Sequence, residues 1–182
     1  MFQEAFNGRL LPGERILWSG QPGQGLLFTS RDTFLIPFSL VWFGFTVFWE
    51  SQVTSQSEAP NFFVLWGAMF MCFGLYMVVG RFIVDAWLRR RINYAVTDQR
   101  VLIVRSAPFA KFVAVSLARL PEVQLSERGN GRGTIRFGQE VMMWGRQGFG
   151  AWSPALDSTP QFLMIDNVRR VFDMIQQTGA KP

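Results

Sequence analysis

The sequence contains no histidine and a single cysteine, Cys72. Without histidine, any candidate active site lacks the commonest general base and the commonest metal ligand. A lone cysteine excludes an intramolecular disulfide and leaves no credible thiolate metal site. Glu122 and Glu127 lie five positions apart on an expected strand, so their carboxylates point to opposite faces. No serine, lysine or carboxylate stands in a recognised nucleophile motif. We therefore expect no enzymatic activity, no catalytic residue, no metal and no cofactor.

Charged residues are absent from two long stretches. Thr33–Trp49 runs for seventeen residues and Phe62–Gly80 for nineteen residues without a charge. A helix of the second length measures about 28 Å, close to the roughly 30 Å hydrocarbon core of a bilayer. The 19 Phe and 7 Trp suit a bilayer better than a soluble core. These stretches predict transmembrane helices at 33–50 and 62–84. The alternative for the first is a buried helix of a soluble protein or an interfacial hairpin.

Lysine and arginine are absent from the connection between the two stretches, residues 51–61. Arg31 precedes the first stretch, and four arginines lie within residues 81–91, after the second. Because Lys and Arg are enriched in cytoplasmic loops, we expect 51–61 to be a periplasmic (outside) loop and both termini to be cytoplasmic. The expected location is a bacterial inner (cytoplasmic) membrane, crossed more than once.

Three glycines predict how the two helices meet. Gly67 and Gly74 are seven positions apart, so they share one face of the second helix. Together with Gly44 on the first helix, they would let the two backbones approach closely.

Positive charge is concentrated after the second stretch, because residues 81–182 hold 15 of the 18 basic residues. Arg89, Arg90 and Arg91 form a block that we expect to hold the helix end at the cytoplasmic face. The same block would bind anionic lipid headgroups, at ~1 kcal/mol per residue near such a surface. The other basic residues are scattered singly, so nucleic acid is not an expected partner.

The stretch 145–160 is rich in glycine, proline and serine and is long for a connection without structure of its own. Phe149 and Trp152 lie in it. They either fold back as a lid or project as an aromatic tip toward headgroups or a partner, where Arg146 would favour an anionic surface. The candidate lipid- or partner-binding residues are therefore Arg89, Arg90, Arg91, Arg146, Phe149 and Trp152.

After Arg91 the apolar pattern changes to alternation. It predicts strands near 92–96, 101–105, 111–117, 123–126, 134–137 and 161–165, with a possible further strand at 139–144. Turns are expected at 97–100 and 129–133, and Asp166 is expected to cap a helix at 167–177. A strand at 15–19 is too short to be stable alone and must join this sheet. The pattern predicts a small antiparallel barrel or sandwich closed by the terminal helix.

Four stretches resemble the bacterial pleckstrin-homology-like (PH-like) domain of small integral membrane proteins. They read LLPGERILWSGQP, NYAVTDQRVLIV, VSLARLPEVQLSERGNGRGTIRFG and FLMIDNVRRVFDMI. The matching motif residues are Tyr94, Thr97, Asp98, Arg100, Gly131, Gly133, Thr134 and Ile135. The resemblance implies a PH-like barrel with a C-terminal helix, preceded by two membrane helices and without shared catalytic residues. A shorter resemblance, limited to the start of the first stretch (LLPGE in this chain), is to an assembly factor of photosynthetic complexes, which has a similar Leu-Pro-x-Gly-Glu start.

The expected fold is therefore an α+β membrane protein. It has a cytoplasmic N-terminal segment (1–32), a transmembrane hairpin, and a cytoplasmic PH-like domain at 85–182. The expected function is a membrane-tethered binding or scaffold protein. The alternative is an accessory or assembly subunit of a larger membrane complex, respiratory or photosynthetic for example, which interacts through its hairpin. Expected partners are membrane lipids, including anionic headgroups, and another membrane protein or complex. The sequence does not assign an oligomeric state.

Overall fold

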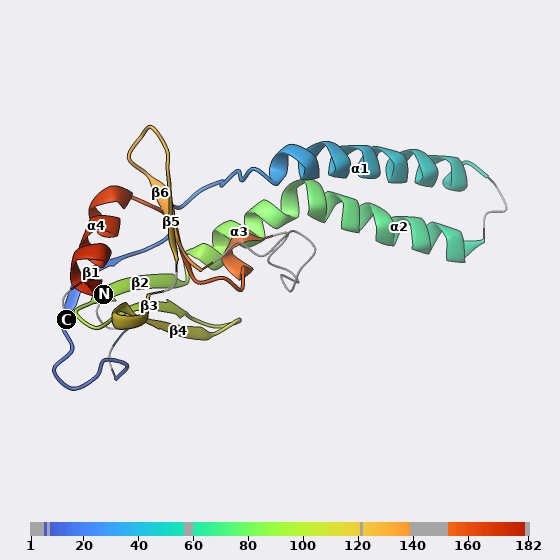
Figure 1. Ribbon diagram of the computed structural model, residues 1–182. Helices are drawn as coiled ribbons and strands as arrows, with labels where there is room; N and C mark the ends of the chain where they lie inside the picture. The colour runs from blue at the N-terminus through green and yellow to red at the C-terminus, as the bar shows by residue number, and fades with distance from the viewer. Residues whose placement is uncertain (1–5, 7, 57–59, 121, 139–152, 181–182) are drawn as a thin grey trace. The chain divides into compact units, whose positions relative to one another are not determined.

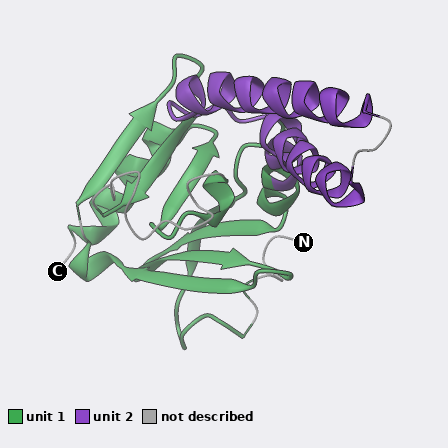
Figure 2. Cartoon of the chain, turned by 90° about the vertical axis from the view of Figure 1, so that its right-hand side faces the viewer, with its two compact units in different colours: residues 1–25, 85–182 green, residues 26–84 purple. Residues whose placement is uncertain are grey.

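The computed structural model describes residues 6, 8–56, 60–120, 122–138 and 153–180. The chain forms two compact units (Figure 2). Unit 1 comprises residues 1–25 and 85–182, and unit 2 comprises residues 26–84. Unit 2 is therefore an insertion in the sequence of unit 1.

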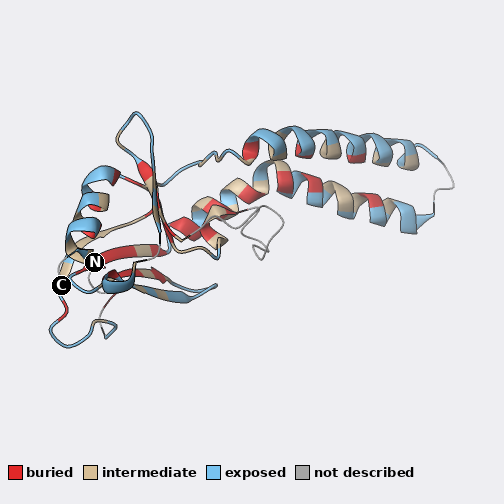
Figure 3. Cartoon of the chain, in the orientation of Figure 1, coloured by how far each residue is buried: buried red, intermediate tan, exposed pale blue. Residues whose placement is uncertain are grey.

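Unit 2 consists of apolar helices. Helix α1 spans Asp32–Thr54, and α2 spans Asn61–Leu75 and continues through a π-helical turn, η2 (Tyr76–Gly80), into α3 (Arg81–Arg89). Both helices are long and apolar enough to cross a membrane. Only 17% of the most apolar window of each is buried, so neither is the buried helix of a soluble core (Figure 3). The two helices that the sequence predicts are present.

The first helix ends later than the sequence analysis expects. Residues 51–54 belong to α1 and not to the connecting loop. Their hydroxyls bond back to the helix, since Ser51 Oγ donates to the Phe48 carbonyl and Thr54 Oγ1 donates to the Glu50 carbonyl. Such local bonds satisfy polar side chains without ending the helix.

Two of the three glycines lie at the contact between α1 and α2. Gly67 and Gly74 are buried, and a Cβ at Gly74 would lie 3.3 Å from the Cα of Phe43. The prediction for Gly44 is wrong, because a Cβ there would meet nothing within 4 Å. The small residues that α1 buries are instead Ser39 and Thr46, whose hydroxyls donate to carbonyls of their own helix.

Unit 1 contains two antiparallel sheets and a terminal helix (Figure 1). The first sheet has the order β1-β2-β3-β4, and the second has the order β5-β6-β7. The strands are β1 (Ile16–Gly20), β2 (Ile92–Thr97), β3 (Arg100–Arg105), β4 (Lys111–Ser116), β5 (Val123–Glu127), β6 (Gly133–Phe137) and β7 (Gln161–Ile165), and the helix is α4 (Val168–Gly179). Short 3-10 turns η3 and η5 lie at Leu117–Arg119 and Pro154–Leu156.

The described strands form two separate sheets and do not close into a barrel. The strand expected at 15–19 is β1, which pairs antiparallel with β2 although unit 2 separates them in sequence. The hairpin turns expected at 97–100 and 129–133 join β2 to β3 and β5 to β6. The possible strand at 139–144 lies outside the described residues.

Aromatic side chains fill the space between the two sheets. Phe162 of β7 lies with its ring centroid 4.5 Å from Tyr94 of β2 and 5.6 Å from Trp18 of β1. The Tyr94 hydroxyl accepts a hydrogen bond from the Leu163 amide. Burial raises the pKa of Tyr94 well above its usual value, so the phenol stays neutral in this core. The two sheets therefore share one core.

Helix α4 buries Val168, Val171 and Ile175 on one face, as its spacing predicts. The expected cap at Asp166 is wrong. The helix begins after Asn167, which has a left-handed backbone and makes no side-chain capping bond. Asp166 instead pairs with Arg132 at 2.6 Å, so its carboxylate is drawn to the β5–β6 turn.

Candidate functional site

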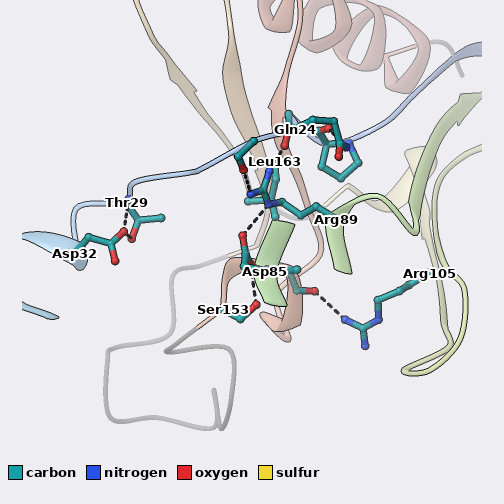
Figure 4. A network of polar contacts seen from close by, with 12 residues as sticks. Gln24, Thr29, Asp32, Asp85, Arg89, Arg105, Ser153 and Leu163 are labelled. Carbon is teal, nitrogen blue, oxygen red and sulfur yellow. Dashed lines mark hydrogen bonds and ion pairs between the residues drawn. The ribbon is translucent and has the colours of Figure 1, made fainter. Parts of the chain in front are cut away.

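Arg89 lies near the point where the chain re-enters unit 1 at Asp85, and it contacts the segment where the chain leaves unit 1, after residue 25. Its guanidinium is completely buried, and Nε donates to Asp85 Oδ2 at 2.7 Å, one helical turn back on α3. The two terminal nitrogens donate to the carbonyls of Gly23 and Gly25, more than sixty residues earlier in the chain (Figure 4). Residues 23–25 are the last of the first segment of unit 1, and Asp85 begins the second. Arg89 therefore ties the two chain ends that flank unit 2.

The Asp85 carboxylate connects a third segment to this cluster. Its Oδ1 accepts hydrogen bonds from Ser153 Oγ at 2.7 Å and from the Ala155 amide at 2.9 Å (Figure 4). Asp85 and Ser153 are both buried. We call Gly23, Gly25, Asp85, Arg89, Ser153 and Ala155 the Asp85–Arg89 network. All six residues belong to unit 1, so the network fixes the local geometry of that unit.

The burial of Arg89 changes the interpretation of the arginine block. A side chain with no exposed surface, and with its donors on a carboxylate and two carbonyls, is not available to a lipid headgroup. Removing a partner of such a buried pair is costly because it leaves an uncompensated charge. Arg89 is therefore a structural residue in this fold.

Arg90 and Arg91 remain at the surface. Both are exposed, and Arg91 Nη1 donates to the Ala107 carbonyl at 2.7 Å. The Arg91 guanidinium also lies 4.1 Å from the centre of the Trp87 ring. Two of the three arginines in the block can thus still meet a lipid surface.

Three predicted site residues, Arg146, Phe149 and Trp152, lie outside the described residues. The described chain resumes at Ser153, which belongs to the Asp85–Arg89 network. Whether the three residues form a lid or a tip therefore stays a prediction.

The motif residues of the PH-like resemblance form a second polar cluster in unit 1. Glu14 accepts hydrogen bonds from Arg100 Nε at 2.8 Å and Arg100 Nη2 at 2.9 Å. It also accepts from Thr97 Oγ1 at 2.7 Å and from the Leu11 amide at 2.6 Å. These bonds, with Arg100 first, lower the pKa of Glu14 from its usual 4.5 to about 2, against the opposing effect of burial.

Asp98 adds a contact between the stretch around Glu14 and the stretch around Arg100. Its Oδ1 accepts from the Arg15 amide at 3.1 Å, and its own amide donates to the Arg15 carbonyl at 3.1 Å. Thr97 Oγ1 accepts from the amides of Gln99 and Arg100, which fixes the β2–β3 turn. The turn expected at 97–100 is present and Thr97 fixes it, but the Asp98 carboxylate does not hold the turn, because it binds the Arg15 amide. Glu14, the partner of Thr97 and Arg100, is not predicted from the sequence, although it lies in LLPGERILWSGQP, the first stretch of the resemblance.

Unit 2 has a buried ion pair of its own. Arg81 Nη1 lies 2.7 Å from Asp32 Oδ1, and both side chains are buried. Thr29 donates its amide and its hydroxyl to the other Asp32 oxygen. Arg81 Nε donates to the Met77 carbonyl, which belongs to the π-helical turn η2. Charges inside and apolar side chains outside are the arrangement found in helices surrounded by lipid.

These clusters consist of carboxylates, guanidinium groups and backbone carbonyls that bind one another, although Arg81 Nη2 is buried without a hydrogen-bond partner. Within the residues that the structure describes, no group of three His, Cys, Asp or Glu residues could hold a metal ion. Comparison of the chain with family models, with curated proteins and with solved structures finds no match.

Proposed function

We propose that the protein is a membrane-tethered binding or scaffold protein that presents a PH-like domain at the cytoplasmic face of a bacterial inner membrane. The observation that carries the proposal is the pairing of β1 with β2. It makes the two apolar helices an insertion within one domain, whose two flanking segments Arg89 ties together.

The pairing limits how the helices can cross a membrane. Strand β1 precedes both helices and β2 follows both. Because the two strands are hydrogen-bonded neighbours, both ends of the inserted segment must open on the same side of the bilayer. An even number of crossings satisfies this condition, and two helices of sufficient length are present. The arginines that flank these ends favour the cytoplasmic side.

Unit 1 supports the PH-like part of the proposal. It combines facing four-stranded and three-stranded antiparallel sheets with a C-terminal helix. The two motifs of the resemblance around Glu14 and around Arg100, which unit 2 separates in sequence, contact each other. A binding role is favoured over catalysis because the buried charged groups of unit 1 are held in internal ion pairs.

Cysteine labelling tests the topology. Cys72 is exposed on α2 and is first replaced by alanine. A cysteine at Ser55, beyond the end of α1, should react with an impermeant thiol reagent added from the periplasmic side, and a cysteine at Ser158 should not. Labelling of Ser158→Cys alone would reverse the proposed orientation, and labelling of both from one side would exclude a spanning hairpin.

Co-purification in mild detergent separates a scaffold from the alternative. Recovery of the full chain in fixed stoichiometry with one membrane complex would favour an accessory or assembly subunit. To place the contact on the hairpin, the same preparation is repeated with the outward-facing Gly44 replaced by leucine. A matched substitution on unit 1, Ser126→Leu on the exposed face of β5, should leave a contact made by the hairpin intact.

A further inference from the structure

The turn between β3 and β4, residues 106–110, lies at the same end of its sheet as the junction between α3 and β2. In the sheet register, Ile92 is opposite Arg105, and Arg105 is opposite Lys111. The Ser106 amide donates to the Arg91 carbonyl at 3.0 Å, and Arg91 Nη1 donates to the Ala107 carbonyl at 2.7 Å. The turn is thus bonded to the junction just after α3.

This end of unit 1 is both aromatic and basic. Phe109 is 54% exposed and Trp87 is 43% exposed. Exposed basic residues surround them, and residues 86–97 and 106–116 contain no aspartate or glutamate. We call the set the tip surface; its members are Trp87, Arg90, Arg91, Phe109 and Lys111.

The backbone beneath Phe109 is held by hydrogen bonds. Arg105 Nε donates to the Phe109 carbonyl, and Arg105 Nη1 donates to the Ala155 carbonyl at 2.8 Å. Lys111 Nζ lies 3.5 Å from the Ser158 carbonyl oxygen. A large aromatic side chain on a turn fixed in this way, and still more than half exposed, contributes little to the core. Among the residues that the structure describes, none covers this side chain by more than about half.

The residues around Trp87 indicate what medium this end of unit 1 faces. On α3, Asp85 and Arg89 are buried while Trp87 is exposed. The burial of Asp85 and Arg89 is explained by their network within unit 1, so the exposed ring of Trp87 is the informative feature. Trp87 lies seven residues beyond the charge-free stretch, or about 10 Å of helix. Trp is enriched at this level of a membrane, where its apolar ring and its one donor are both satisfied.

We propose that the tip surface docks onto the headgroup layer of the bilayer that the hairpin enters. The rings of Phe109 and Trp87 sit among the headgroups and upper acyl chains, and Arg90, Arg91 and Lys111 contact anionic phospholipid phosphates. The surface has the composition of interfacial membrane-binding segments, which pair apolar aromatic side chains with Lys and Arg. The inference rests on the proposed membrane tether and adds the face by which unit 1 meets the lipid.

Depth-dependent fluorescence tests this docking. In a Cys72→Ala background, Phe109→Cys carries a polarity-sensitive label in the full chain, reconstituted in vesicles of phosphatidylcholine with or without phosphatidylglycerol. Phe112→Cys is the matched control, because Phe112 is similarly exposed, at 44%, but lies on β4 with its ring against Arg9. The label at 109 should be quenched several-fold more by lipid-borne quenchers than the label at 112, and more with phosphatidylglycerol. Replacing Arg90, Arg91 and Lys111 by glutamine should reduce the difference.

Equal access of an aqueous quencher to both labels in either lipid would overturn the docking. Protection of position 109 in native membranes, but not in pure lipid vesicles, would also overturn it and would indicate a protein partner. Alkaline extraction of the same vesicles separates this failure from a failure of the membrane tether. A chain that resists extraction, but keeps position 109 in water, would contradict only the docking.

Discussion

Units 1 and 2 place their side chains in opposite ways. Unit 1 buries apolar residues such as Leu102 and Ile135 between its sheets and helix. Unit 2 exposes its apolar side chains, with Val41 at 74% and Leu65 at 74%, and buries the Asp32–Arg81 pair. The apolar side chains of the two units are therefore arranged for different surroundings. These are water for most of unit 1 and, in our interpretation, lipid for unit 2. Buried ion pairs occur in both units, so they do not by themselves distinguish the two media.

The largest expected effect concerns the buried pair in unit 1. Asp85→Ala leaves the Arg89 guanidinium buried without its carboxylate, which should lower the free energy of unfolding by about 3–5 kcal/mol. Asp166→Ala is the control, because the Asp166–Arg132 pair is on the surface, with side chains 72% and 50% exposed; its loss should cost about 0–1 kcal/mol. Urea unfolding of the full chain in detergent measures both. Equal destabilisation by the two substitutions would contradict the structural role of Arg89.

A second pair of substitutions tests the contrast between the two exteriors. Val41→Arg places a charge on the exposed centre of α1, which should disfavour membrane insertion by about 2.5–3.5 kcal/mol. Leu17→Arg places the same charge at a 47% exposed position of β1, where surface substitutions change stability by about 0.5 kcal/mol or less. The fraction of each chain that resists alkaline extraction is the measurement. If both variants inserted as well as the parent chain, the exterior of unit 2 would not be lipid.

The Glu14–Arg100 pair predicts an acid-sensitive contribution to the stability of unit 1. Because the folded pKa of Glu14 is lowered to about 2, its contribution is complete above pH 4.5 and is lost as the pH falls toward 2. Glu14→Gln should therefore cost about 2–3 kcal/mol at neutral pH and progressively less in acid. Unfolding curves from pH 7 to pH 2 measure the change. A pH-independent cost for Glu14→Gln would refute the assignment.

The smallest effect concerns the contact between α1 and α2. Leucine at Gly74 would collide with Phe43, and overpacking of this kind should cost about 1–3 kcal/mol. Gly44→Leu introduces the same side chain where no atom lies within 4 Å, so it should be neutral. The melting temperatures of the two variants in detergent give the comparison. A Gly44 variant as unstable as the Gly74 variant would place a contact on the outer face of α1.

The sequence is most informative where its pattern is local. Runs without charge predict both helices, alternation predicts the strands, and the Thr97–Arg100 stretch predicts the turn that the structure contains. The sequence also predicts that β1 joins this sheet, since a short isolated strand is not stable alone, but only the structure shows that its partner is β2. The helices, the strands and the turn each depend on residues close together in the chain.

The failures concern side chains whose partners are distant. Three successive arginines predict a surface block, yet Arg89 is buried because carbonyls from residues 23–25 accept its hydrogen bonds. The four-residue spacing from Asp85 was the one available signal for this pairing. Asp166 was expected to cap α4, but an arginine on another hairpin binds it. Propensity cannot predict such outcomes, because they depend on tertiary neighbours.

The insertion of unit 2 between β1 and β2 also sets an order of events during synthesis. Strand β1 leaves the ribosome with Gly20, and its partner begins only at Ile92. At roughly 5–20 residues per second, the interval is about 4–14 seconds, longer than many domains need to fold. During that time both apolar helices emerge from the ribosome. Under the proposed membrane tether, β1 and β2 pair only after the segment between them has been inserted, so completion of unit 1 would follow insertion.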